Sequence, residues 1–139
     1  MKIKFYPYTI NLKKQFTISV NSRKTTPEVM VEVAHNGLDG YGEASLPPYL
    51  SENQSSVISF LNKVNLDSFN DPANINSMLD YIDSIEEDNN AAKACVDIGL
   101  HDLLGKFLDI PLHKYLGISI RDDIYSSFTI GISNLRNLK

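Results

Sequence analysis

The side chains able to do chemistry are few in this chain of 139 residues. Its three histidines, His35, His101 and His113, have no cysteine or carboxylate at the spacing of a known metal site. His101 and Asp102 are adjacent on a predicted helix, where neighbouring side chains point about 100° apart, so they cannot chelate one ion together. We therefore expect no metal site at these histidines.

The only cysteine and the only glycine-rich element also lack a reactive setting. Cys95 lies in an alanine-rich helical pattern, which predicts a small buried residue, and one cysteine cannot form an internal disulfide. Gly40-Tyr41-Gly42 precedes Pro47-Pro48 rather than a helix N-terminus, so a phosphate-binding role is not expected. No nucleophile elbow, P-loop or Cys-x-x-Cys motif is present.

Two polar segments remain as candidates for binding. The first is a predicted loop over residues 21–27, which contains Arg23 and Lys24. The second follows Pro47-Pro48 and contains Tyr49. Two polar loops anchored by strands could close over a ligand, and a solvated surface is the alternative that the residues leave open.

Composition and charge exclude several classes of protein. The chain carries 13 Lys and Arg against 17 Asp and Glu, a net charge of −4, so it lacks the basic face of a nucleic-acid-binding protein. A hydrophobic content of 42% with 22% charged residues argues against disorder. No run of 18 apolar residues predicts a membrane span, and no signal peptide is recognisable, so we expect a cytoplasmic protein.

Strand patterns come first along the chain and helical patterns follow. Alternating residues predict strands over 2–6, 28–34 and 41–44, joined as an antiparallel meander. Apolar residues at helical spacing then predict helices that begin at a Ser51–Gln54 capping box, at Asp71-Pro72, near Asn89 or Asn90, and at Pro111, the last ending at Gly117. The third helix has a predicted buried stripe that runs to Phe107. This order indicates an α+β fold.

The end of the sequence returns to a strand pattern. Residues 124–132 have high β propensity, and Ser133 then resembles an N-cap, with Leu135 and Leu138 beginning an apolar stripe. A strand that leads into a helix predicts the first unit of a β/α series that is cut off early. We therefore expect the chain to be part of a larger protein.

Several motifs together resemble the N-terminal half of the enolase superfamily, and within it the dipeptide epimerases of the muconate-lactonizing subgroup, of the L-Ala-D/L-Glu epimerase type. The resemblance covers nearly the whole chain and is carried by residues 40–44 (GYGEA), 45–49 (SLPPY), 91–106 (AAKACVDIGLHDLLGK), 110–117 (IPLHKYLG) and 128–132 (FTIGI).

The resemblance implies a capping domain over residues 1–120, with a three-stranded sheet and a helical bundle, and the first strand of a truncated TIM-type barrel over 121–139. In such enzymes two lysines exchange the α-proton of a bound dipeptide, and Mg²⁺ on barrel carboxylates stabilises the enolate. The lysine motif and the three acidic ligands belong to later barrel strands. The resemblance therefore implies no catalytic residue and no metal ligand in this chain, which would carry only lid and pocket residues. The small-molecule substrate would be a dipeptide, and the full-length enzyme a homo-oligomer.

Four residues are implied to bind substrate. Thr129 corresponds to a threonine that contacts substrate in the dipeptide epimerases, and Tyr49 belongs to the second lid loop. An arginine in the first loop pairs with a substrate carboxylate in the Ala-Glu epimerases. Counting from Phe16 places that position at Asn21, whereas the arginine stands at Arg23, so both are candidates.

Two other functions are consistent with these residues. One is a stand-alone α+β module that binds a small molecule or a partner without catalysis. The other is the capping domain of a muconate cycloisomerase or an o-succinylbenzoate synthase-like enzyme.

Overall fold

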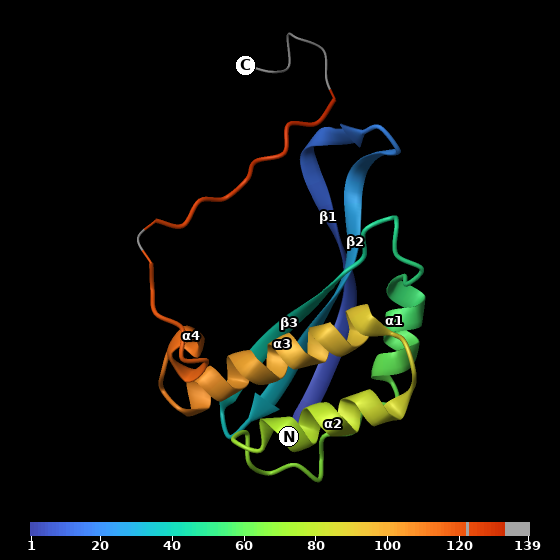
Figure 1. Cartoon of the computed structure of the whole chain (residues 1–139). Coiled ribbons are helices and arrows are strands. Elements are labelled where there is room, and N and C mark those ends of the chain that lie inside the picture. Colours follow the sequence, from blue (N-terminus) through green and yellow to red (C-terminus); the bar gives the residue numbers. More distant parts are fainter. Residues whose placement is uncertain (122, 133–139) are drawn as a thin grey trace.

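Three antiparallel strands precede the helices in the computed structural model, which describes residues 1–121 and 123–132 (Figure 1). The strands are β1 (Lys2–Ile18), β2 (Asn21–His35) and β3 (Leu38–Ser45), in the sheet order β1-β2-β3. The helices are α1 (Gln54–Leu61), α2 (Ile75–Ile85), α3 (Asn90–Phe107) and α4 (Leu112–Tyr115). The predicted meander followed by helices is confirmed. The predicted helix start at Ser133, with Leu135 and Leu138, lies outside the described residues.

Alternation along β2 explains which face of the sheet the helices cover. Val29, Val31 and Val33 have no exposed surface, because they point toward the helices. The residues between them point to the opposite face. The buried valines join α1, α2 and α3 in one core, whose other large members include Phe60, Leu61, Met78, Ile82, Leu100, Leu103 and Leu104.

The predicted loop over residues 21–27 is wrong. These residues begin β2 and pair with the end of β1, with Ser22 opposite Thr17 and Arg23 opposite Phe16, beyond an irregularity between Asn11 and Phe16. Strand β3 pairs only with residues 28–35, so the rest of the hairpin is a two-stranded ribbon that rises above the sheet (Figure 1). Both faces of such a ribbon meet solvent, so the sequence shows no hydrophobic alternation there.

Helix α3 lies directly on β3 because glycine occupies the contact points. A Cβ atom at Gly42 would overlap the backbone oxygen of Cys95, and one at Gly40 would overlap that of Gly99. The predicted stripe of α3 is buried as far as Leu103, and Cys95 is buried as predicted. Phe107 is instead 41% exposed, because the helix there reaches the end of the sheet, where the ring makes a T-shaped contact with His35.

Two predicted helix starts shift in the structure. Asn53, not Ser51, caps α1: its side chain accepts the Ser56 backbone N–H at 3.1 Å, and the Ser56 hydroxyl accepts the Asn53 N–H at 2.9 Å. The Ser51–Gln54 box fails because Asn53 lies closer to the first apolar turn and makes the same reciprocal bonds. Asp71 closes a turn by accepting the Ala73 N–H at 2.9 Å, and α2 begins later, at Ile75.

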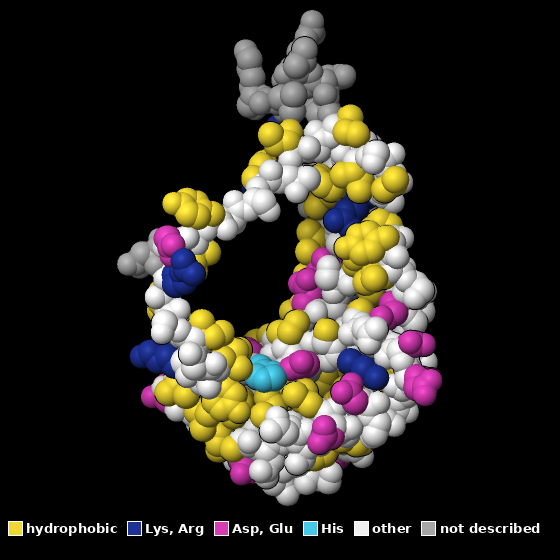
Figure 2. Space-filling view, viewed as in Figure 1, with side chains coloured by type: hydrophobic (Ala, Val, Ile, Leu, Met, Phe, Trp, Pro, Cys, Tyr) yellow, Lys and Arg dark blue, Asp and Glu magenta, His cyan; other side chains and the backbone are white. Residues whose placement is uncertain are grey.

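The predicted strand over residues 124–132 is also wrong. This segment leaves α4 and runs toward the tip of the hairpin, with an opening between it and the rest of the molecule (Figures 1 and 2). Within the described residues its backbone makes one hydrogen bond to another backbone group, from the Ile132 N–H to the Thr17 carbonyl at 2.7 Å. High β propensity forms no strand without a neighbouring strand to pair with.

The contact of α3 with β3 predicts losses of different size for two glycine-to-alanine changes. Gly42→Ala must push the helix away and should lower the free energy of unfolding by about 3 kcal/mol. Gly99→Ala is the matched control, because its nearest neighbour is Val33 Cγ2 at 3.4 Å, an ordinary contact. Alanine also favours helix, so Gly99→Ala should cost less than about 1 kcal/mol. Urea unfolding measures both, and equal losses would contradict the close contact.

Candidate functional site

A cleft lies between the tip of the β1–β2 ribbon and the segment 46–50. It contains two adjoining cavities of about 360 and 340 Å³. Asn21, Arg23, Pro47 and Pro48 line both of them. The first cavity extends to Glu52 and Asn53, and the second is completed by Phe16, Ile18, Val20 and Tyr49.

Three of the four predicted substrate-binding residues meet in this cleft. Arg23 is half-buried, and its guanidinium carbon lies 5.9 Å from the centre of the Phe16 ring, a cation–π contact that holds the side chain across the ribbon. Asn21 stands two residues before it on β2, next to the turn. Tyr49 lies on the opposite wall and is 84% exposed. The arrangement offers a guanidinium and an amide beside apolar rings.

Thr129 does not line the cleft. The chain meets the ribbon two residues later, where Gly131 packs against Phe16 and Thr17, and Ile132 bonds the Thr17 carbonyl. Thr129 is thus close in sequence to the residues that contact the ribbon tip, but it lines neither cavity.

Hydrogen bonds from Gln54 and Glu52 fix the wall formed by residues 46–53. The Gln54 side-chain amide donates to the backbone oxygens of Tyr8 and Glu28, both at 2.9 Å, and so ties the start of α1 to the ribbon. The Glu52 carboxylate accepts the Ala91 N–H at 3.0 and 3.1 Å, at the start of α3. A negative group there also suits the positive end of the helix dipole. The wall is thus attached to both layers of the domain.

Sequence reasoning missed Glu28 and Gln54. Glu28 is 4% exposed and lies below the cleft, on the central strand. Burial raises the pKa of its carboxyl, and the neighbouring Glu43 raises it further. Burial also raises the pKa of Tyr8, with a further contribution from Glu28. A glutamate next to three alternating valines was the available signal. Its neighbours on the other strands could be identified only once the pairing register of the sheet was known.

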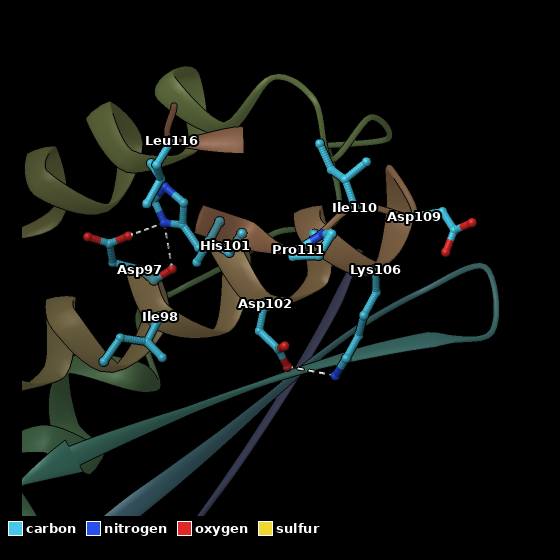
Figure 3. Close-up of a pocket in the computed structure, with 11 residues that line it drawn as sticks. Asp97, Ile98, His101, Asp102, Lys106, Asp109, Ile110, Pro111 and Leu116 are labelled. Carbon is cyan, nitrogen blue, oxygen red and sulfur yellow. Dashed lines mark hydrogen bonds and ion pairs between the residues drawn. The ribbon is translucent and has the colours of Figure 1, made fainter. Parts of the chain in front are cut away.

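A larger and more open groove, of about 820 Å³, lies between α3 and residues 109–116 (Figure 3). Four of its polar side chains are paired with one another: His101 Nδ1 bonds Asp97, and the Lys106 ammonium lies 2.7 Å from Asp102. The Asp109 carboxyl also lines the groove. Ile98, Ile110 and Leu116 make much of the rest of its lining. We favour the cleft as the functional site because its guanidinium has no ion-pair partner among the described residues.

The described part of the chain contains no group of three or more His, Cys, Asp or Glu side chains arranged to hold a metal ion. None of its helices is long and apolar enough to cross a membrane.

The chain belongs to a known family. Residues 2–117 match the N-terminal domain of the mandelate racemase and muconate lactonizing enzymes, a family of the enolase superfamily. The sheet and helices described above are the fold of that capping domain.

Relatives of this family include several epimerases. The chain is 49% identical over 132 residues to an L-Ala-D/L-Glu epimerase of Bacteroides thetaiotaomicron, covering 95% of this chain and 34% of the relative. It is 32% identical over 139 residues to an L-Ala-D/L-amino acid epimerase of a Maribacter species, covering 97% of this chain and 40% of the relative. It thus spans little more than a third of these curated relatives.

Solved structures of dipeptide epimerases also superimpose on this chain. A dipeptide epimerase of Cytophaga hutchinsonii, complexed with Mg and D-Ala-L-Val, superimposes with a TM-score of 0.80 at 27% identity, covering 94% of this chain and 36% of that one. A dipeptide epimerase of Methylococcus capsulatus, complexed with Mg and L-Arg-D-Lys, gives a TM-score of 0.84 at 25% identity, covering 98% and 39%.

The setting of Cys95 predicts an inert thiol. Burial raises its pKa to about 12, and the sulfur is 3.5 Å from the Val29 carbonyl oxygen. At pH 8 the folded chain should react with Ellman's reagent on the order of a thousandfold more slowly than free cysteine, because so little thiolate forms. The same chain unfolded in urea should react at the ordinary rate. Rapid reaction without denaturant would show that the helix does not seal this position.

Proposed function

We propose that this chain is the substrate-capping part of a Mg²⁺-dependent dipeptide epimerase, with residues 1–120 as the cap and 121–139 as the start of a barrel. The supporting observation is the cleft, where Arg23 and Asn21 face Tyr49 at the edge of a domain that matches epimerase relatives. The homo-oligomer and the cytoplasmic location stay predictions.

The described residues offer no Mg²⁺ site, so in this proposal the ion and the proton-transferring groups belong to the part of the enzyme beyond this chain. Mg²⁺ would supply positive charge beside the substrate carboxylate. The part played by the cap is to bind the end of the dipeptide distant from the reacting carbon and to exclude water. Binding energy from that remote end also helps to orient the α-carbon.

Arg23 is the residue on which we base substrate choice. Its planar guanidinium suits a carboxylate, with which it can form two parallel hydrogen bonds. Phe16 already restricts the side chain, so little conformational freedom is lost when a substrate binds. We therefore propose a dipeptide with an acidic side chain, with Asn21 and Tyr49 as further contacts. Thr129 would join them only if the segment 124–132 takes a different path in the full-length enzyme.

Exchange of the α-proton tests the proposed reaction. The full-length protein that contains this chain should incorporate deuterium from D₂O at the α-carbon of the second residue of L-Ala-L-Glu, as followed by NMR. Chelation of Mg²⁺ should stop the exchange. A protein that exchanges no dipeptide in a broad panel would contradict the proposal. It would favour the other enzymes of the subgroup or a binding module.

Replacement of Arg23 tests the proposed specificity. Arg23→Ala should lower kcat/KM for L-Ala-L-Glu by on the order of 10- to 100-fold, the usual value of a charge-assisted pair, and should change kcat/KM for L-Ala-L-Leu little. Lys24→Ala is the control, because the neighbouring Lys24 is exposed and lines neither cavity. Equal losses on both dipeptides would show that Arg23 shapes the cleft without reading the substrate charge.

A further inference from the structure

A carboxyl group without a partner lies where the ribbon, the sheet and the first helix meet. Only 4% of Glu28 is exposed, and its Oε2 atom is fully buried without a hydrogen-bond partner among the described residues. A buried carboxylate of this kind is costly unless it is paired or neutralised. Glu28 therefore needs an explanation that its strand alone does not give.

The sheet register brings a second carboxyl to the same place. Glu28 is opposite Tyr8 on β1, while Glu43 on β3 is opposite Met30, two residues further along β2. Glu28 and Glu43 are thus diagonal neighbours on one face of the sheet, within reach of long side chains. The other ionisable groups near Glu28 are Tyr8 and, on its own strand, Arg23. From α1 the neutral amide of Gln54 donates to the backbone oxygen of Glu28, not to its carboxyl group.

Two ionised carboxylates cannot hydrogen-bond each other, because neither has a donor. One proton between them removes a buried charge and provides the missing donor. We propose that Glu28 and Glu43 share one proton, and that this proton acts as a pH-sensitive latch holding the two walls of the cleft together.

The position of the pair explains why it would act as a latch. Gln54, which anchors the wall formed by residues 46–53, donates to the backbone oxygens of Glu28 and of its partner Tyr8. Loss of the shared proton leaves two negative charges at that junction, between β2 and β3. Their repulsion is relieved when the strands and the anchored wall move apart. The latch is independent of which substrate the cleft binds.

The direction of the pH effect follows from the raised pKa of Glu28. Because the folded state holds this proton more tightly than the unfolded chain, its contribution to stability is complete below the ordinary pKa of 4.5. It is lost as the pH rises from there through the raised pKa of the folded state. One linked proton lowers the folding equilibrium constant by up to tenfold per pH unit within that window.

Urea unfolding of this chain at several pH values tests the latch. Glu28→Gln places a neutral donor permanently at the junction, so its folding constant should not show this component of pH dependence. Above the window it should exceed that of the wild type. Glu32→Gln is the matched control, because Glu32 lies on the same face of β2 but forms an exposed ion pair with Lys4 at 3.0 Å. That variant should retain the wild-type dependence, and a dependence that persists in Glu28→Gln would overturn the proposal.

Two measurements on the chain complete the test without relying on a variant that folds. The carboxyl ¹³C resonance of Glu28 in the wild type should titrate above the ordinary range of a carboxyl group. Hydrogen-exchange protection of the amides of residues 21–26 and 28 should fall over the same pH interval. Titration of Glu28 at the ordinary carboxyl pKa would overturn the shared proton, and unchanged protection during the titration would overturn the latch.

Discussion

Contact between the backbones of α3 and β3 determines the positions of the other parts of the domain. Glycines at positions 40 and 42 allow the helix to approach within a distance that any side chain would prevent. Polar bonds then hold it in place: Asp102 accepts the Tyr41 N–H at 2.9 Å, and the Lys106 ammonium donates to the Asp39 carbonyl at 2.6 Å. Because β3 leads into residues 46–53, this contact also sets where the wall of the cleft begins.

Most of the fold could be predicted from the sequence because its core has a regular period. Alternating valines marked β2, and apolar residues at helical spacing marked α1, α2 and α3. The mistakes occurred where the period carries no information. The ribbon tip has solvent on both faces, so its strands resembled a loop. Residues 124–132 have strand propensity, but a segment forms a strand only when it pairs with a neighbouring strand. At the start of α1, Ser51 and Asn53 are both suitable N-cap residues, and the sequence pattern does not distinguish between them.

The candidate site was predictable only in part. Arg23 and Tyr49 lie in the two polar segments that the sequence already marked as candidates, and resemblance to a family added Asn21. The structure brings all three to one cleft. Their convergence depends on the length of the ribbon, which no local pattern revealed. Glu28 and Gln54 could not be found, because their significance arises from contacts between distant parts of the chain. Gln54 and Glu28 are 26 positions apart, and Gln54 and Tyr8 are 46.

The two-stranded tip of the ribbon also affects how the sequence of this chain can evolve. The buried core draws its β-strand residues from positions 29–44, whereas the cleft draws its ribbon residues from positions 16–27. Residues that hold the fold are thus separate from residues that face the cleft. Amino-acid changes at the tip can accumulate without unpacking the core, so new ligand preferences can be sampled while the domain keeps folding. A single scaffold with such a tip is well suited to diversify into a group of enzymes with different substrates.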